Sequence, residues 1–182
     1  MADNTPFSLK NRIAAVTGSS SGIGNTIADK LQLVEAPVVD ADIKEPVDNP
    51  DTNNSHFFLF KTDVTSVEQV QQLSNLVKQN AVPSHLLACN AGRGIYEKLA
   101  EGNPDKRAYV INIHLTSTLR ILRSFLPDIH SSGEDYAAFI SSVSFKNPCA
   151  YEGIYAVTKT VIDIINNINI TLVRQTYLKK ME

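Results

Sequence analysis

Short apolar runs of strand length alternate along this chain with longer amphipathic segments, and this alternation limits the folds that the sequence can adopt. The strand-like runs cover residues 12–18, 36–43, 56–64, 84–92 and 135–142. The helix-like segments cover residues 22–34, 65–80, 103–129 and 153–175, and a Pro-, Asn- and Asp-rich loop covers residues 44–55. This order predicts an α/β fold with a parallel sheet. It is typical of a doubly wound, Rossmann-like nucleotide-binding sheet, strand order 3-2-1-4-5, with helices on both faces.

Local signals predict where the helices begin and end. In the second helical segment, Thr65 or Ser66 is the expected N-cap, and Glu68 is placed to close a capping box. The pair Asn103-Pro104 opens the third segment, and Pro127 is expected to stop it. In the first segment, four apolar residues recur on one helix face: Ile23, Ile27, Leu31 and Val34.

Length and composition restrict the domain count and the partners. A chain of 182 residues suits one domain, residues 1–182, with a sizeable core. The formal net charge is −2 and no dense basic block is present, so neither nucleic acid nor an anionic membrane is expected as a partner. The N-terminus carries no apolar signal core, and no apolar run is long enough to span a bilayer. We therefore expect a cytoplasmic protein.

The cysteines and histidines do not indicate a metal centre. Cys89 and Cys149 lack metal-type or CxxC spacing, and we expect two reduced, partly buried thiols. The histidines are scattered and show no ligand-pair spacing: His56, His85, His114 and His130. No metal site is expected.

The glycine-rich stretch VTGSSSGIG, residues 16–24, joins the first predicted strand to the first predicted helix. Its glycines free the backbone to turn sharply and to approach a pyrophosphate, and the helix N-terminus adds unpaired N–H groups and a positive dipole end. Glycines often follow strands in turns that bind nothing, so the trio alone is weak evidence. The candidate cofactor contacts in this stretch are Gly18, Ser20, Ser21, Gly22, Ile23 and Gly24.

An acidic residue follows the glycines at the distance that dinucleotide binding requires. Asp42 lies eighteen positions after Gly24, at the end of the second strand, where a carboxylate can accept hydrogen bonds from the adenosine ribose. It would repel a 2′-phosphate, and no arginine stands nearby, so we predict NAD rather than NADP. A solvated acid at the strand end is the plainer interpretation, and Asp40 on the same strand is a rival.

Together with the glycine loop, motifs along the chain resemble those of the short-chain dehydrogenase/reductase family, from about Ser8 to the end. The carriers are residues 17–24, Asp63-Val64, Asn90-Ala91-Gly92, Ser142 and the stretch YAVTK at 155–159. The resemblance implies that Asp63 and Val64 contact the adenine side of the cofactor. It also implies that Asn90, Ala91 and Gly92 line the cofactor where the fourth strand ends, and its spacing selects Ser142 over Ser141 and Ser144.

The pair Tyr155 and Lys159 is spaced to share one helix face. The cofactor carries out hydride transfer, so the protein must supply a proton and polarise a carbonyl. A lysine cation one turn away, with the positive nicotinamide ring, favours the phenolate, so Tyr155 would serve as acid in reduction and base in oxidation. The Ser142 hydroxyl could stabilise charge on the substrate oxygen. Taken alone, the pair would be an ordinary exposed helical pair.

One family position is occupied by an unexpected residue. The family places a catalytic asparagine thirteen residues before a helix-ending proline, and counting back from Pro127 gives His114. Asn112 lies about 160° away around the helix and is expected to point off the site. An imidazole can donate, accept and charge near neutrality, so His114 could bridge to a water near Lys159. We expect weakened rather than abolished activity; a broken proton relay is the alternative.

The sequence after the last helix, ending in LVRQTYLKKME, offers no further apolar strand and no Pro-Gly turn. Members of the family usually continue with a strand and a substrate lid, so we expect a fold truncated after the YxxxK helix, with the fifth strand at an uncovered edge. The final helix is apolar on more than one side, which predicts self-association as a dimer or tetramer. Its stripe comprises Val157, Val161, Ile164, Ile165, Ile168 and Leu172, and its second flank Ile154, Thr158 and Ile162.

The sequence therefore predicts an NAD-dependent oxidoreductase that interconverts a secondary alcohol and a ketone, small molecules whose identity stays open. Two alternatives remain: a catalytically weak or inactive NAD-binding or assembly module, and a fragment without stable activity.

Overall fold

The computed structural model describes residues 13–44, 57–79, 84–132 and 136–181. Within these residues, five parallel strands form one sheet in the order β3-β2-β1-β4-β5. The strands are β1 (Ile13–Thr17), β2 (Val38–Asp42), β3 (Phe57–Lys61), β4 (Ser84–Cys89) and β5 (Tyr136–Phe139). The predicted α/β fold and strand order are confirmed. The chain runs from β1 out to β2 and β3 on one side and then crosses to β4 on the other side, so a topological switch point lies between β1 and β4.

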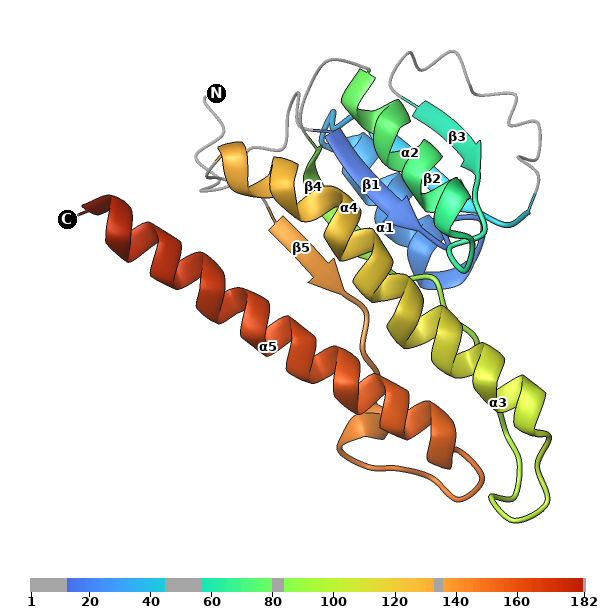
Figure 1. The fold of residues 1–182 in the computed structure, drawn as a ribbon. Helices are drawn as coiled ribbons and strands as arrows, with labels where there is room; N and C mark the ends of the chain where they lie inside the picture. Colours follow the sequence, from blue (N-terminus) through green and yellow to red (C-terminus); the bar gives the residue numbers. More distant parts are fainter. Residues whose placement is uncertain (1–12, 45–56, 80–83, 133–135, 182) are drawn as a thin grey trace.

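Helices cover both faces of the sheet (Figure 1). The α-helices are α1 (Gly22–Leu33), α2 (Val67–Gln79), α3 (Pro104–Ile111), α4 (Ser117–Ser132) and α5 (Gly153–Met181). A π-helical segment, Asn112–Thr116, joins α3 to α4, and a 3₁₀ turn, Val143–Phe145, follows β5. The polar loop predicted at 44–55 lies almost wholly outside the described residues.

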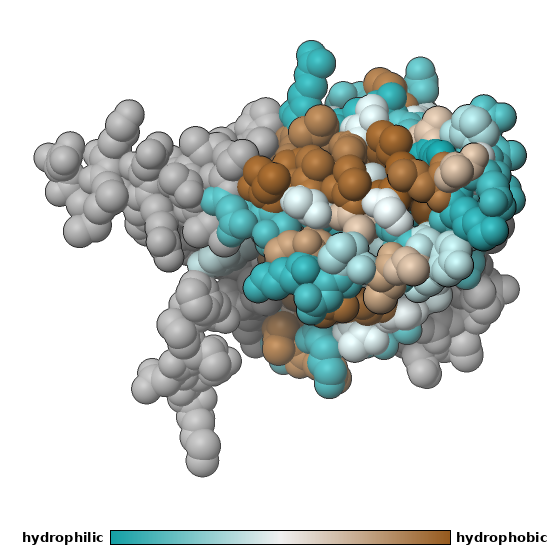
Figure 2. Space-filling view, turned by 90° about the horizontal axis from the view of Figure 1, so that it is seen from below, coloured by the Kyte–Doolittle hydropathy of each residue, from teal (hydrophilic) through white to brown (hydrophobic). Residues whose placement is uncertain are grey.

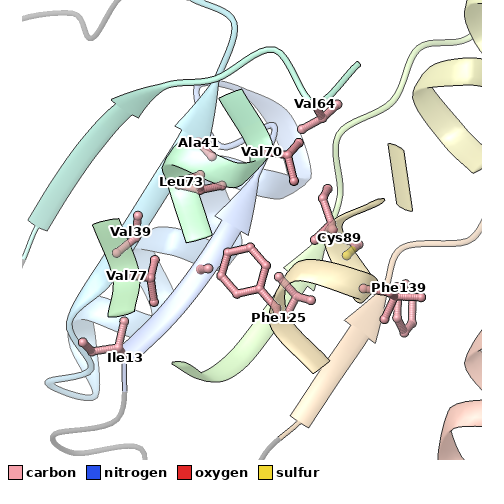
Figure 3. Close-up of a cluster of buried hydrophobic side chains, with 14 of the residues drawn as sticks. Ile13, Val39, Ala41, Val64, Val70, Leu73, Val77, Cys89, Phe125 and Phe139 are labelled. Atoms are coloured by element: carbon pink, nitrogen blue, oxygen red, sulfur yellow. The ribbon is translucent and has the colours of Figure 1, made fainter. Parts of the chain in front are cut away.

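Two hydrophobic cores fill the space between the sheet and its helices. The larger core packs α2, α4 and α5 against one face, with Leu73, Ile121, Phe125 and Ile162 all buried (Figure 3). The smaller core packs α1 against the other face. Successive strand residues point to opposite faces, so the uninterrupted apolar run of β1 supplies both cores.

The apolar stripe predicted for the first helix is its buried face only in part, since Leu31 is buried and Ile27 packs against the smaller core. Ile23 and Val34 are 63% and 50% exposed, and the buried residues of α1 are Gly24, Ala28 and Leu31. Small residues let α1 approach the sheet closely, whereas a hydrophobic periodicity count favours the large side chains. All four residues also line an open groove on α1: Ile23, Ile27, Leu31 and Val34.

The third predicted helix begins where expected and then departs from the prediction. The Asn103 side chain caps α3 by accepting from the N–H groups of Asp105 and Lys106, with Pro104 in the first turn. The helix does not stop at Pro127, because α4 continues to Ser132. A proline removes a single backbone donor, and the buried residues that precede it stabilise the helix across that gap.

The second helix is capped by Ser66, one of the two predicted candidates. The Ser66 hydroxyl accepts from the Gln69 N–H at 3.2 Å. Glu68 does not close a capping box, since its carboxylate accepts from the Ser66 hydroxyl. Gln69 stands at the third helical position, and its side chain accepts from the N–H of Asp63 at 2.7 Å.

The final helix buries the flank that was expected to be secondary. Thr158 and Ile162 are buried, whereas Val157 and Ile164 of the predicted stripe are 60% and 52% exposed. Ile168 and Leu172 lie outside the described side chains. Apolar side chains also gather in a band on the face of the molecule seen in Figure 2. In the described part of the chain, we find no helix with the length and apolarity needed to cross a membrane.

Candidate active site

The glycine loop turns from β1 into α1 through two left-handed residues. Gly18 and Gly22 have φ angles of +69° and +59°, a region that side chains with a Cβ disfavour. A Cβ on Gly18 would lie 2.8 Å from the Cα of Ala91, and a Cβ on Gly24 would collide with the Gly18 carbonyl oxygen. The loop therefore needs glycine for its conformation at two positions and for close approach at Gly18 and Gly24.

Asn90 joins the glycine loop to the end of β4, across the switch point. Its side-chain N–H₂ group donates to the carbonyl oxygens of Thr17 and Gly18 at 3.1 and 3.0 Å. The Thr17 hydroxyl in turn accepts from the N–H groups of Asn90 and Ala91, both at 3.1 Å. These bonds fix the distance between the carboxyl ends of β1 and β4, and the cavity at this edge of the sheet depends on that distance.

Asp42 and Asp40 have different surroundings, although they lie two residues apart on β2. Asp42 ends the strand, and its carboxylate accepts from the N–H groups of Ser20 and Lys44 at 3.1 and 3.0 Å. Asp40 is 3% exposed and faces the α1 side, where burial raises its pKa to about 6. Asp42 and not Asp40 therefore faces the cavity beside the glycine loop.

A cavity of about 330 Å³ opens at the carboxyl ends of β1, β2 and β4. It brings together most of the residues predicted for cofactor binding, and Lys44 joins them. Asp63 is not among its lining residues, because the Asp63 carboxylate accepts from the N–H and hydroxyl of Thr65 at 2.8 and 2.7 Å. The lining residues are Gly18, Ser21, Ile23, Ala41, Asp42, Ile43, Lys44, Thr62, Val64, Asn90, Ala91, Gly92 and Ile113.

A second cavity, of about 150 Å³, continues from the first and shares three of its lining residues. It is lined by Tyr155 and Lys159 from α5 and by His114 from the π-helical segment. The shared residues are Ile23, Asn90 and Gly92. Two regions that are far apart in the sequence, the glycine loop and the start of α5, thus border one continuous cleft.

Lys159 lies beside Tyr155 with its stem buried. Its Nζ is 5.7 Å from the centroid of the Tyr155 ring and donates to the carbonyl oxygen of Ile140 at 2.6 Å. Burial lowers the pKa of Lys159 to about 8. The side chain is therefore a cation at neutral pH and approaches its neutral form under mildly alkaline conditions.

The three serines after β5 have separate roles in the structure. The Ser141 hydroxyl donates to the carbonyl oxygen of Lys159 at 2.9 Å and so holds α5. Ser142 caps the 3₁₀ turn by accepting from the Ser144 N–H at 3.2 Å. Ser144 is buried and donates to the carboxylate of Glu152 at 3.0 Å. Ser142 does not line the second cavity, whereas Ser141 does.

His114 is buried, and protein groups occupy both of its ring nitrogens. Nε2 accepts from the N–H of Arg93 at 3.0 Å, so the proton resides on Nδ1, which donates to the Thr158 hydroxyl at 2.7 Å. Thr158 then donates to the carbonyl oxygen of Tyr155 at 2.8 Å. Burial, followed by the charge of Lys159, lowers the pKa of His114 to about 4.

These contacts change the interpretation of His114. The sequence suggested an imidazole that bridges to a water and charges near neutrality, but the ring is neutral at that pH and has no free nitrogen. It packs edge-on against the Tyr155 ring, with centroids 5.6 Å apart. Asn112 points elsewhere, as expected, since its Oδ1 faces the Arg120 guanidinium at 3.4 Å. Arg93 and Thr158, the partners of His114, were not identified from sequence.

The cysteines lie apart from the cleft and differ in exposure. Cys89 is buried, which raises its pKa to about 12, but Cys149 is exposed rather than partly buried as expected. Among the described side chains, no group of three or more His, Cys, Asp or Glu residues is arranged to hold a metal ion.

Comparison with known proteins agrees with this fold and cleft. Residues 12–168 match the short chain dehydrogenase family, and the chain belongs to this family. It is 26% identical over 159 residues to an uncharacterized oxidoreductase of Staphylococcus epidermidis, covering 86% of this chain and 69% of that protein. An uncharacterized oxidoreductase of Saccharomyces cerevisiae is 27% identical over 140 residues, covering 77% of this chain and 46% of that protein.

Solved structures show the same arrangement of elements. A short-chain dehydrogenase from Streptomyces avermitilis superimposes with a TM-score of 0.86 at 22% identity, over 91% of this chain and 62% of that one. A short-chain dehydrogenase/reductase from Burkholderia phymatum in complex with NAD has a TM-score of 0.86 at 25% identity, over 93% of this chain and 63% of that one. The chain thus spans less than two thirds of the length of these structures.

Proposed function

We propose that the chain is a cytoplasmic, NAD-dependent oxidoreductase that interconverts a secondary alcohol and a ketone, with Tyr155 as general acid and base. The observation that carries the proposal is the continuous cleft. A phenol beside a buried lysine borders the same cavity system as a glycine loop and a strand-end carboxylate. Neither half alone would distinguish a dehydrogenase from a binding module or an ordinary helix surface.

The residues of the cleft fit a dinucleotide. Ser21 does not cap α1 with its side chain, so the N–H groups of the helix N-terminus are available to a pyrophosphate, and the space beside Gly22 is open. Val64 and Asp42 line the first cavity and would hold the adenosine, and Asn90 and Gly92 border both cavities. When bound, the nicotinamide dinucleotide supplies the hydride donor or acceptor.

The protein's own groups supply the proton and the polarisation. The Lys159 cation beside the phenol of Tyr155 favours the phenolate, so Tyr155 can take the proton of an alcohol or return it to a reduced ketone. The hydroxyl of Ser142, which follows β5 in the chain, would hydrogen-bond the substrate oxygen. His114 acts by holding the start of α5 through Thr158, not by transferring a proton.

The choice of NAD over NADP rests on Asp42, whose carboxylate would repel a 2′-phosphate. The structure in complex with NAD from Burkholderia phymatum supports it. Lys44 is the opposing feature, since it lines the same cavity. An L-sorbose reductase of Gluconobacter frateurii, with a TM-score of 0.83 at 24% identity, is complexed with NADPH. The repulsion at Asp42 decides for NAD, since Lys44 lies beyond the strand end and is exposed.

His114 favours one alternative function, a non-catalytic NAD-binding or assembly module. A proton relay from the lysine through water needs a free polar group at this position, and both nitrogens of the imidazole are occupied. Such a module would bind NADH and turn nothing over.

The test is NADH titration of the purified 182-residue chain, followed by nicotinamide absorbance with a panel of ketones and secondary alcohols. Turnover that falls 10²- to 10⁴-fold in Tyr155→Phe, with NADH affinity unchanged, supports the enzyme. Tyr109→Phe is the matched control, the same change on α3. NADH binding without turnover on any panel member favours the module. A chain with neither NADH binding nor a cooperative melt would leave only the fragment.

We also propose that α5 pairs two copies of the chain. Val157 and Ile164 lie seven residues apart on one face of α5 and are large apolar residues that stay more than half exposed. The double variant Val157→Glu/Ile164→Glu should halve the mass measured by light scattering and keep the circular dichroism spectrum. A wild-type chain that is monomeric at micromolar concentration would contradict the pairing.

A further inference from the structure

Three side chains form a hydrogen-bonded row that leads from the predicted substrate contact into the protein. The Ser142 hydroxyl lies 3.1 Å from the Ser144 hydroxyl, and the Ser144 hydroxyl lies 3.0 Å from a carboxylate oxygen of Glu152. Ser144 and Glu152 are each 7% exposed. A glutamate buried to this degree is uncommon unless it is paired, and here the Ser144 hydroxyl is a partner of its carboxylate.

Counting protons gives the row a direction. An ionised carboxylate only accepts, and a serine hydroxyl has one proton to donate. The Ser144 proton is directed at Glu152, so Ser144 can only accept from Ser142. The Ser142 proton is therefore held by Ser144. Ser142 already accepts from the Ser144 N–H at 3.2 Å, which leaves it one lone pair and no proton for a ligand.

The backbone around Glu152 is built to hold its side chain in this place. The preceding residue, Tyr151, has a left-handed φ of +71°, which costs free energy in a residue with a bulky side chain. The Tyr151 carbonyl oxygen accepts from the Glu97 N–H at 2.9 Å, and the Glu152 carbonyl oxygen accepts from the Ala156 N–H at 2.8 Å. The strained turn is thus fixed on both sides, immediately before α5.

A second hydroxyl group approaches the same carboxylate. Tyr96, on the loop after β4, interacts with the Glu152 carboxylate, which raises the pKa of the phenol. Glu152 therefore joins the loop that follows Gly92 to the turn that carries Ser142.

We propose that Glu152 is a positioning residue that acts through Ser144 to hold the Ser142 proton away from the substrate, so that the resting site receives an alcohol more readily than a ketone. The inference rests on the proposed function, in which Ser142 contacts the substrate oxygen. When an alcohol enters the resting site, and before Tyr155 takes its proton, its hydroxyl can donate to the remaining lone pair of Ser142. A ketone has no proton to donate, and Ser142 must break its bond to Ser144 before it can donate to the carbonyl.

The test compares Michaelis constants in the two directions. In Glu152→Gln, the side-chain amide can donate to Ser144, which reverses the row and frees the Ser142 proton for the substrate. We expect KM for the ketone, divided by KM for the corresponding alcohol, to fall about 5-fold, the effect of one net hydrogen bond. Ser144→Ala removes the acceptor of the Ser142 proton and should shift the ratio in the same direction.

The same two substitutions, made in a Ser142→Ala background, test whether Glu152 acts on the substrate through Ser142. If Glu152 acts through Ser142, neither Glu152→Gln nor Ser144→Ala changes the KM ratio once Ser142 is gone. An equal shift in both backgrounds, or an unchanged ratio in both variants, overturns the proposal. Glu101→Gln makes the same chemical change at an exposed residue paired with Lys98 and should leave the ratio unaltered. Melting temperatures identify a variant whose effect comes from unfolding.

A crystal structure of Ser144→Ala separates this inference from the proposed function. If the wild-type chain turns nothing over, the proposed function fails, but the row can still be judged. A Ser142 side chain held by Ser144 should leave its wild-type rotamer when that acceptor is removed. A Ser142 rotamer that stays in place would overturn the row whatever the activity.

Discussion

The two ends of the cleft are built from different kinds of interaction. At the nucleotide end, backbone groups make the contacts: the Gly18 N–H donates to the Ala41 carbonyl oxygen at 2.7 Å, and the Ser20 N–H donates to Asp42. At the catalytic end, buried side chains bond to groups in other segments, both backbone and side chain. His114 bonds to residues 21 and 44 positions away in the sequence, Arg93 and Thr158.

This difference decides which changes each end can tolerate. A backbone-built loop depends on the absence of side chains and should fail when a Cβ is added in a crowded position. A side-chain network depends on hydrogen-bonding capacity and protonation, and should respond to polar substitutions and to pH. Predictions for the two ends therefore concern different measurements.

The largest effect is expected at the nucleotide end, from Gly24→Ala. The added Cβ would collide with the Gly18 carbonyl oxygen and the Asn90 side chain, so the loop must shift, and we expect NADH affinity to fall at least 100-fold by fluorescence titration, the scale of a 1 Å displacement. Gly22→Ala is the control, because a Cβ there meets open space. It should cost only about 1–2 kcal/mol of left-handed strain. Equal losses in both variants would contradict a steric origin.

At the catalytic end, His114→Ala should lower the free energy of unfolding by about 3 kcal/mol, measured by urea denaturation, since it leaves a buried gap and unpaired groups. His114→Asn should lose less, because an amide oxygen can still accept from the Arg93 N–H. The amide also keeps donors for a water, so its turnover should exceed that of the wild type. A stability loss under 1 kcal/mol in the alanine variant would show that the network is not structural.

The nucleotide end could be predicted from sequence because its signals are local. Gly18, Gly22 and Gly24 follow one strand within a few residues, and Asp42 ends the next strand, so spacing alone brings them to one edge. The exposed Ile23 and Val34 on α1 show the limit of this approach, because hydrophobic periodicity counts large side chains and does not detect the close packing of Ala28.

The catalytic end could be predicted only in part. Tyr155 and Lys159 lie one helical turn apart, so their spacing in the sequence was enough to predict that they share one helix face. The inward orientation of His114 depends on the π-helical segment, and the partners of its two nitrogens lie in other segments. Both depend on packing between segments that are far apart in the sequence. Glu152 gave no sequence signal at all, because a glutamate before a helix is an ordinary surface residue until the turn at Tyr151 directs it inward.

The pH dependence of stability should separate the two faces of the sheet. The folded pKa of His114 is about 4 against an ordinary 6.5, so its contribution is complete above pH 6.5 and is lost as pH falls towards 4. Asp40 acts oppositely, since its pKa is raised to about 6 from 3.8, and its contribution is lost as pH rises through that window. Each amounts to about 3 kcal/mol, and in the wild type they nearly cancel.

Asp40→Asn should remove the opposing contribution of Asp40, so that the effect of His114 on the pH dependence of stability can be measured. Its free energy of unfolding should fall by about 3 kcal/mol more than that of the wild type between pH 6.5 and 4, measured by denaturant titration at several pH values. Adding His114→Asn should flatten the curve again. Parallel curves for Asp40→Asn and the wild type would contradict the buried state of Asp40.

The smallest expected effect concerns cofactor choice at the nucleotide end. Asp42→Ala removes the carboxylate that accepts from the Ser20 N–H and would repel a 2′-phosphate, and it leaves Lys44 beside the cavity. We expect NADH affinity to fall about 10-fold, the loss of one charged hydrogen bond, and NADPH affinity to rise. Asp105→Ala, at an exposed acid on α3, is the control. Because this end is otherwise built from backbone, the loop should keep its fold, so the melting temperature without cofactor should change by no more than about 4 °C, the shift expected for 1 kcal/mol. A large melting shift would mean that Asp42 stabilises the loop and does not simply select the cofactor.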